Sequence, residues 1–349
     1  SNNTAIGTDS LTANTTGTDN VAVGAFALDA NTTAINNTGI GTNALTANST
    51  GNNNTSVGQS TLKTNTTGAQ NTACGRAALF ANTTADNNTA VGSLALNQNT
   101  TGTNNVAVGS NALDTNTTGS QNIAIGQSAM NDNTTGINNT VVGYAALHEN
   151  TTANNNTAIG YASLFANTTG TSLTAIGAFA LDANTTANNN VAVGVESLTD
   201  NTTGAFNTAV GDNTLANNTT ASNNTAVGLS ALFANTTGAN NVAVGSFALD
   251  ANITGSFNTA VGLDALTACT TSENTAVGAR SLKSLTSGSL NTAVGMNALR
   301  ETTTGTNNTA VGDEALRENT TGSDNVAIGA IALDANTTGN QNIAIGKNS

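Results

Sequence analysis

The chain of 349 residues contains no proline and no tryptophan, one histidine and two cysteines. Charged residues make up 8% of it and aromatic residues 3%, whereas about 25% of an average soluble protein is charged. Few large side chains are therefore available for a globular core of this length. Because potential ligands and nucleophiles are so scarce, we expect no catalytic, cofactor-binding or metal-binding residues and no enzymatic activity.

The charge and hydropathy of the chain exclude further classes of protein. Seven Lys and Arg against 20 Asp and Glu give a net charge of -13, so the basic surface of a nucleic-acid-binding protein is missing. No apolar run reaches the ~20 residues of a membrane-spanning helix. No cationic and then apolar signal segment opens the chain, so we expect Ser1 to begin a processed product or a fragment.

What the chain has instead is a 17-residue repeat. A glycine, preceded by Val or Ile everywhere except at Cys74, recurs at this spacing throughout, with a single spacing of 16 between Gly262 and Gly278. We call it the anchor glycine. The repeat unit reads N-T-A-V-G-x-x-A-L-x-x-N-T-T-G-x-N, and residues 88–104 are a clean copy. Internal repeats of this kind define elongated, repetitive folds.

The period predicts the fold. It is shorter than the roughly 33 to 47 residues of a helix-pair repeat, and Asn, Thr and Gly are poor helix formers. The alternating triplet before the anchor glycine is typical of a strand, and a second short run, Ala-Leu, follows it. We predict an all-β fold, a parallel β-solenoid of about 21 coils with 17 residues and two short strands per coil, stacked at about 4.8 Å into a rod of roughly 100 Å.

The repeat fills residues 1–349 as one continuous solenoid domain. Neither end carries the polar capping repeat that keeps solenoids soluble and unjoined. We therefore expect either a segment of a longer chain or a unit that stacks end to end with its neighbours.

The strand triplet also predicts which side chains point inward. We expect its first and third residues, together with the Leu column that only Met130 interrupts, to fill the coil interior. The central residue would then point outward, yet it is Ala in every coil except at Gly39, Ser56 and Val141. Since an exposed column should vary more, we predict that it packs on a neighbouring chain around a symmetry axis. The alternative is that Ala only suits a flat strand or a fold-back within the chain.

The Asn-Thr-Thr segment is the most regular polar motif. Asn occupies its first position in 17 of the 20 complete turns, always as N-x-[S/T]. This pattern fits an array of N-glycosylation acceptors, or a hydrogen-bonded Asn ladder that follows the coil, which we favour. Ice binding by the threonines is less favoured, because adjacent residues of an extended chain point to opposite sides.

The rare residue types suggest little chemistry. We expect Cys74 in the core and Cys269 in a turn, more than ten coils apart and too distant for a disulfide within one chain. His148, next to Glu149, is expected at the surface. Acidic residues at variable positions, such as Asp182 and Asp250, match no calcium-binding loop. We expect them to form a solvated surface whose mutual repulsion keeps a fibre soluble.

The aromatic residues recur at fixed repeat positions, and we expect them to be exposed. They support packing between chains or segmental duplication, with the binding of sugars or partners as the less favoured alternative. One set is Phe26, Phe179 and Phe247, a second is Phe80, Phe165 and Phe233, and a third is Tyr144 and Tyr161.

The unit N-[TVI]-A-[VI]-G-x-x-A-L resembles the head repeats of trimeric autotransporter adhesins (YadA-like), which carry an N-S-V-A-I-G-like signature. The 17-residue form with N-T-T-G is similar to repeats of phage tail-fibre-type and bacterial surface proteins. The resemblance covers the whole chain and implies a parallel β-roll, trimerised along its length, in an extracellular, cell-surface or virion fibre. Adhesin heads usually have a shorter repeat, and no stalk, membrane anchor or chaperone domain is seen in these residues.

Together these observations predict a non-enzymatic fibre or adhesin segment, homotrimeric, that projects or spaces a binding tip. Other domains would then contact a cell-surface glycan or receptor. One alternative is a self-stacking extracellular filament subunit, and another is a repeat module that binds ice or glycans. We expect no cofactor, no nucleic-acid partner and no membrane span.

Overall fold

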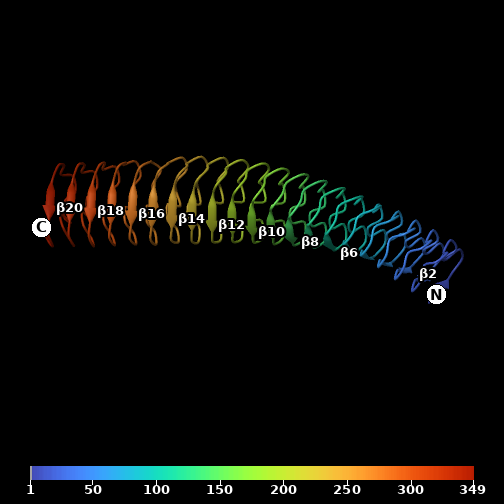
Figure 1. Ribbon diagram of the computed structural model, residues 1–349. Helices are drawn as coiled ribbons and strands as arrows, with labels where there is room; N and C mark the ends of the chain where they lie inside the picture. Colours follow the sequence, from blue (N-terminus) through green and yellow to red (C-terminus); the bar gives the residue numbers. More distant parts are fainter. Residues whose placement is uncertain (1) are drawn as a thin grey trace. The chain divides into compact units, whose positions relative to one another are not determined.

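The computed structural model describes residues 2–349 and divides into two compact units, an N-terminal unit, Ser1–Leu173, and a C-terminal unit, Thr174–Ser349. In each unit, every turn of the chain contributes one three-residue strand that lies beside the strand of the next turn (Figure 1). All pairings within the units are parallel, for example that of β6 with β7. The predicted all-β parallel solenoid, with about 17 residues per turn, is confirmed.

The 21 strands follow the repeat. The N-terminal unit contains β1 (Thr4–Ile6), β2 (Val21–Val23), β3 (Thr38–Ile40), β4 (Thr55–Val57), β5 (Thr72–Cys74), β6 (Thr89–Val91), β7 (Val106–Val108), β8 (Ile123–Ile125), β9 (Thr140–Val142) and β10 (Thr157–Ile159). The C-terminal unit contains β11 (Thr174–Ile176), β12 (Val191–Val193), β13 (Thr208–Val210), β14 (Thr225–Val227), β15 (Val242–Val244), β16 (Thr259–Val261), β17 (Thr275–Val277), β18 (Thr292–Val294), β19 (Thr309–Val311), β20 (Val326–Ile328) and β21 (Ile343–Ile345).

The second strand expected in each coil does not form. The Ala-Leu run lies in consecutive turns, and its leucines adopt left-handed backbone conformations, with φ of 50° at Leu96 and 52° at Leu113. Hydrogen bonds between coils nevertheless continue here, since the amide of Leu96 donates to the carbonyl of Ala112 at 3.0 Å. The backbone is thus satisfied by the coil stacking without an extended segment.

The anchor glycine is required by both conformation and space. Its φ lies between 128° and 147° in every coil, a region that residues with a side chain rarely adopt. A Cβ atom at Gly109 would lie 2.4 Å from the carbonyl oxygen of Gly126 in the next coil. The positive φ and the close approach together explain why this position is glycine in every coil.

The predicted orientation of the strand triplet is wrong. The central alanines, such as Ala90 and Ala107, are fully buried, whereas the third residues Val91 and Ile125 are 38% and 39% exposed. Since side chains alternate along a strand, assigning one residue to the wrong face inverts all of them. The core is narrow, because a second buried Ala column and the Leu column, here Leu113, share it with the strand alanines. Among the 21 strands, Val141 of β9 is the one larger apolar residue buried at the central position.

The narrow core accepts polar residues where their hydroxyl groups find a hydrogen-bond partner, as Ser163 does at the Gly160 carbonyl. Ser56 replaces a central strand alanine, and Thr61 in the same coil replaces an alanine of the second column. Their hydroxyl groups hydrogen-bond to each other, and Thr61 Oγ1 also donates to the carbonyl of Gly58 at 3.0 Å. Each substitution therefore supplies the partner that the other needs when buried.

Candidate functional site

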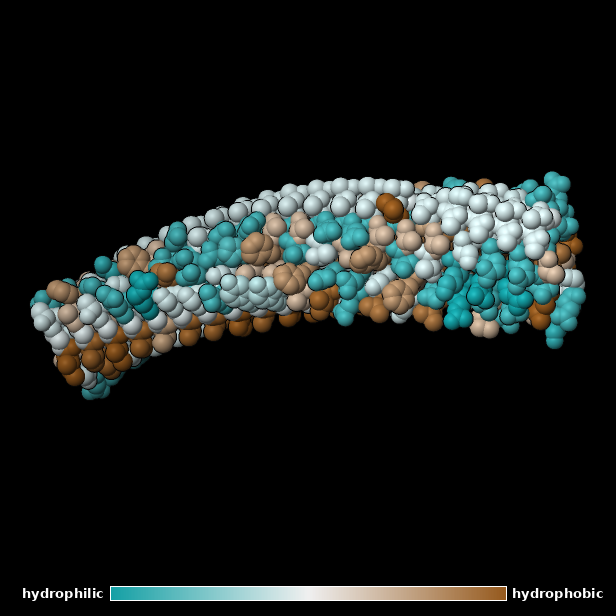
Figure 2. All heavy atoms as spheres, turned by 180° about the vertical axis from the view of Figure 1, so that it is seen from behind, coloured by the Kyte–Doolittle hydropathy of each residue, from teal (hydrophilic) through white to brown (hydrophobic). Residues whose placement is uncertain are grey.

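The first and third residues of every strand point outward and form two columns, which we call the strand face. The first position is Thr in 14 of the 21 strands and Val or Ile in the others, and the third is Val or Ile in all strands except β5, which has Cys74. No charged residue lies on this face. In Figure 2, apolar residues recur at regular intervals along the left part of the lower edge of the view.

The geometry of the strand face follows from the pairing of the strands. Equivalent residues are aligned, as Thr89, Val106 and Ile123 are in β6, β7 and β8. Columns of this kind repeat at about 4.8 Å between strands and about 7 Å along each strand. The face is thus a regular, uncharged lattice of methyl and hydroxyl groups in each unit.

Cys74 was expected in the core, but it lies exposed on the strand face. The same inversion that places its valine neighbours outside places its thiol outside. Cys269 is buried, and this burial raises the pKa of its thiol. The chain therefore carries one thiol exposed on the strand face and one buried directly after a turn.

The Asn-Thr-Thr asparagines form a buried ladder. Asn65 is fully buried, and its amide donates to Asn48 Oδ1 at 2.8 Å and to the Gly68 carbonyl at 2.9 Å. A second buried column lies just before the strands, where Asn54 Oδ1 accepts the backbone amide of Asn71 at 3.0 Å. These contacts support the structural interpretation of the motif, because a glycan on a buried amide would have to displace them.

The ladder is interrupted in the C-terminal unit, where Cys269, Leu285 and Thr302 replace the asparagine of three successive coils. Asn252 Oδ1 and Thr302 Oγ1 are buried without a hydrogen-bond partner there. The single 16-residue spacing, between Gly262 and Gly278, falls in the same region. The regular spacing and the Asn–Asn contacts of the ladder are therefore lost in the same coils.

The first threonine of Asn-Thr-Thr uses its hydroxyl within the solenoid. Thr100 Oγ1 donates to the Thr117 carbonyl of the next coil at 3.0 Å, and Thr117 repeats the contact with Thr134. These hydroxyl groups are therefore committed to the coil stacking. A binding array of threonines would have to use the strand face or the second threonine of the motif, which is exposed at Thr67, Thr84 and Thr101.

The aspartates five residues after the anchor glycine are not a fully solvated surface. Asp114, Asp182 and Asp250 are half-buried, and desolvation raises the pKa of each. Asp114 Oδ1 and Asp250 Oδ1 have no hydrogen-bond partner. Asn97 and Asn131 occupy the same column and instead donate to carbonyl oxygens 20 residues earlier, those of Ala77 and Asn111.

Replacing Asp114 with Asn should stabilise the N-terminal unit by about 1 kcal/mol at pH 7, because the new amide can donate to the Leu94 carbonyl, the acceptor predicted by the repeat. The raised pKa means that folded Asp114 holds its proton more tightly than the unfolded chain does. Its contribution to the free energy of unfolding therefore grows as the pH falls from 7 toward 3.8, the ordinary pKa. Urea unfolding at pH 7 and pH 4 should show this increase in the free energy of unfolding for the wild type. In Asp114→Asn, the part of the increase that comes from Asp114 should be absent.

The matched control is Asp9→Asn, which removes a charge from an exposed residue. It should leave the stability at pH 7 within about 0.5 kcal/mol of the wild type. A destabilised Asp114→Asn variant would contradict the assignment of an unfavourable buried carboxylate.

Aromatic side chains stack between consecutive turns. The rings of Tyr144 and Tyr161 lie 5.4 Å apart and are nearly parallel, and His148 stacks on Phe165 at 5.2 Å. His148 Nδ1 lies 3.9 Å from Asp132 Oδ2. Exposure is confirmed for both tyrosines and for Phe26, Phe179, Phe233 and Phe247, whereas Phe80 and Phe165 are half-buried.

The most exposed phenylalanines, Phe206 and Phe257, were not singled out from the sequence. They are 61% and 62% exposed. Both lie two residues before a strand, in a column otherwise occupied mostly by Asn, Gln and Asp. The recurrence of Phe at this repeat position is the sequence signal that could have identified them.

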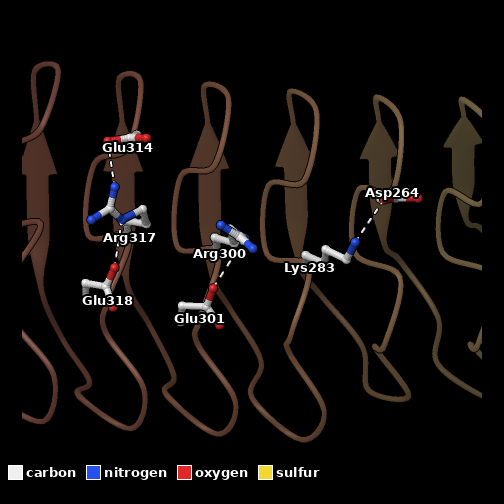
Figure 3. Close-up of polar contacts among 7 residues, drawn as sticks. All are labelled: Asp264, Lys283, Arg300, Glu301, Glu314, Arg317 and Glu318. Atoms are coloured by element: carbon white, nitrogen blue, oxygen red, sulfur yellow. Dashed lines mark hydrogen bonds and ion pairs between the residues drawn. The ribbon is translucent and has the colours of Figure 1, made fainter.

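The basic residues are neutralised where they cluster. Lys283, Arg300 and Arg317 occupy one column on three consecutive turns, and each pairs with an acid (Figure 3). Lys283 Nζ lies 2.9 Å from Asp264 Oδ2. A hydrogen bond to Glu318 and the charge of Glu314 raise the pKa of Arg317. Such half-exposed pairs contribute little stability, and they leave no unpaired cationic column for a polyanion.

Residues 2–349 contain no group of three or more His, Cys, Asp and Glu side chains arranged to hold a metal ion. Over the same residues there is no helix long and apolar enough to cross a membrane. No protein-family model matches the chain, and its comparison with curated proteins gives no significant match. The fold defines the chain as a β-solenoid repeat protein, and the strand face is the surface with the clearest chemical character.

Proposed function

We propose that this chain is a structural, non-enzymatic rod segment of an extracellular, cell-surface or virion fibre, and that it binds copies of itself through the strand face. The observation that carries the proposal is the exposed Val and Ile column, continued through successive strands of each unit. Contiguous exposed apolar surface of this extent marks an interaction site. The Ala column that first suggested a partner is buried and no longer supports one.

A second copy is the partner that fits this face best. The face repeats with the coil spacing, so a partner must present apolar groups at the same spacing, as an identical chain does. Copies with a net charge of -13 repel each other in most orientations. The strand face carries no charge and lets apolar columns meet.

The area of the strand face is sufficient for a stable interface. We estimate on the order of 1,000 Å² per unit, compared with about 800 Å² per partner in a standard interface. A three-fold arrangement, as the resemblance to trimeric adhesin heads implies, would place the face at the common axis. The rod would then hold its binding tip away from the surface that carries it.

The test is to place charges on the face. Exchanging Val91, Val108 and Ile125 for lysine adds three charges to β6, β7 and β8 without disturbing the buried alanines. Analytical ultracentrifugation should show a trimer for the wild type and a folded monomer for this variant, because burying unpaired charges is prohibitively costly. A monomeric wild type would contradict the proposal, and thermal hysteresis in that monomer would support the ice-binding alternative.

A matched control adds the same charge elsewhere on the surface. Asn104, Gln121 and Asn138 are exposed and lie two residues before β7, β8 and β9. Exchanging these three residues for lysine should leave the trimer intact. Cys74 provides an independent test of contact through the strand face. Copies that meet along this face bring their Cys74 thiols together, so oxidation should yield a disulfide-linked dimer. The buried Cys269 should form none.

A further inference from the structure

The chain carries a second set of N-x-[S/T] tripeptides, distinct from the Asn-Thr-Thr ladder. They read Asn-Asn-Thr, and their first residue lies in the turn two residues before the strand, while the Thr is the first residue of that strand. The eight first residues are all exposed: Asn2, Asn36, Asn53, Asn87, Asn138, Asn155, Asn223 and Asn307.

The turn holds these side chains outward. Asn53 and Asn138, for example, have φ of 60° and 59°. From Asp19 to Gln341 every residue of this column, whatever its type, has the same left-handed conformation. Phe206 and Phe257 stand in the same column and remain 61% and 62% exposed. A bulky group attached at this position therefore projects into solvent.

The other N-x-[S/T] asparagines are in the opposite situation. Asn116 of the ladder is fully buried, and its amide donates to Asn99 Oδ1 at 2.8 Å and to the Gly119 carbonyl at 3.0 Å. Asn54 is buried as well. The half-buried Asn217 is followed by a Thr219 whose hydroxyl already donates to the Thr236 carbonyl.

We propose that the exposed Asn-Asn-Thr column is the N-glycan acceptor array of the folded chain and that the Asn-Thr-Thr ladder is not. The motif is the one that N-glycosylating enzymes recognise, and in this column its amide is accessible. The sugar donor is a nucleoside-diphosphate hexose. The Asn Nδ2 forms a bond to C1 of the hexose and loses a proton, while the C1–O bond breaks and the nucleoside diphosphate leaves.

The hydrogen bonds of the column rank the sites. Asn36 donates to Asn53 Oδ1 at 3.3 Å, and Asn307 donates to Asp324 Oδ1 at 2.7 Å. Asn87, Asn138 and Asn155 make no such side-chain contact within residues 2–349, so their amides need give up no protein hydrogen bond to react. We expect these three to be modified before Asn307.

The test treats the purified folded chain with a soluble N-glycosyltransferase and a nucleoside-diphosphate hexose, and maps the products by mass spectrometry. It uses both the wild type and the monomeric strand-face lysine variant, in which the Thr of each motif is uncovered. The expected result is a mass increase of one hexose per acceptor, up to eight, confined to the exposed column. In chain unfolded in urea and then diluted into the reaction, the ladder asparagines should become modified too. Hexose on Asn116 of the folded chain, or none on the exposed column when the unfolded chain is modified, would overturn the proposal.

The repeat itself supplies matched variants for one site. Asn53→Gln introduces the residue present at Gln70 and Gln121 of the same column, and Thr55→Val introduces the one present at Val106. Both should fold like the wild type, and each should lose the hexose on Asn53 while that on Asn87 remains. Continued modification of Asn53 in Thr55→Val would show that the tripeptide is not what the enzyme reads.

Discussion

Replacing Gly109 with alanine should destabilise the N-terminal unit by about 3 kcal/mol or more, through backbone strain and a steric clash. The φ of Gly109 is 137°, where an L-residue is strained. The added Cβ would lie 2.4 Å from the carbonyl oxygen of Gly126, the residue that follows β8. Removing this clash would require the two coils to separate. Thermal and urea unfolding followed by circular dichroism measure the loss.

The second glycine column provides the control. A Cβ at Gly119 would also be close to a carbonyl oxygen, that of Gly136 at 2.5 Å. The chain nevertheless has Ala in this column at five coils, including Ala85 and Ala153, so the backbone can adjust there. Gly119→Ala should cost about 1 kcal/mol or less, and equal losses for both variants would contradict the special status of the anchor glycine.

The effect of Gly109→Ala should also be local. Coils of a solenoid contact only their neighbours, so stability is approximately a sum of nearest-neighbour terms. Amide hydrogen exchange should accelerate first in the turns around β7 and β8 and remain slow around β3.

The repeat length and the anchor glycine predicted the fold, because stacking a short coil leaves few ways to satisfy the backbone. The orientation of the strand triplet could not be predicted in the same way. In a triplet such as Val106-Ala107-Val108, all three residues are apolar, so hydropathy alternation gives no sign of which face is buried. Burial follows side-chain volume instead, since the smallest residue of this triplet, Ala107, is the one that the structure buries.

The same limit applies to the candidate sites. Asn53 and Asn54 are adjacent and chemically identical, yet one is exposed and the other fully buried. Their difference depends on the left-handed turn at Asn53 and on the contact that Asn54 makes with the Gly68 carbonyl at 2.9 Å. Neither feature is visible in an N-x-[S/T] pattern, which drew attention to the buried ladder instead.

Replacing Asn116 with alanine should cost about 2 to 4 kcal/mol, the second large effect expected for this chain. Three hydrogen bonds are lost at once, because Asn116 Oδ1 also accepts the amide of Asn133 at 2.7 Å. Asn99 Oδ1, the Gly119 carbonyl and the Asn133 amide would then be buried with fewer partners. Urea unfolding of the wild type and the variant measures the difference.

Two comparisons separate the ladder from a general effect of losing an asparagine. Asn104→Ala removes an exposed side chain two residues before β7's first valine. Because the φ of Asn104 is 60°, where Ala is less favourable than Asn, this variant should cost about 1 kcal/mol or less. Thr302→Asn makes the reverse change in the C-terminal unit, where Thr302 Oγ1 is buried without a partner and the ladder is interrupted. Its new Oδ1 can accept the amide of Asn319, so this variant should be more stable than the wild type by about 1 kcal/mol. Equal stability losses for Asn104→Ala and Asn116→Ala would contradict the ladder's role in holding successive coils together.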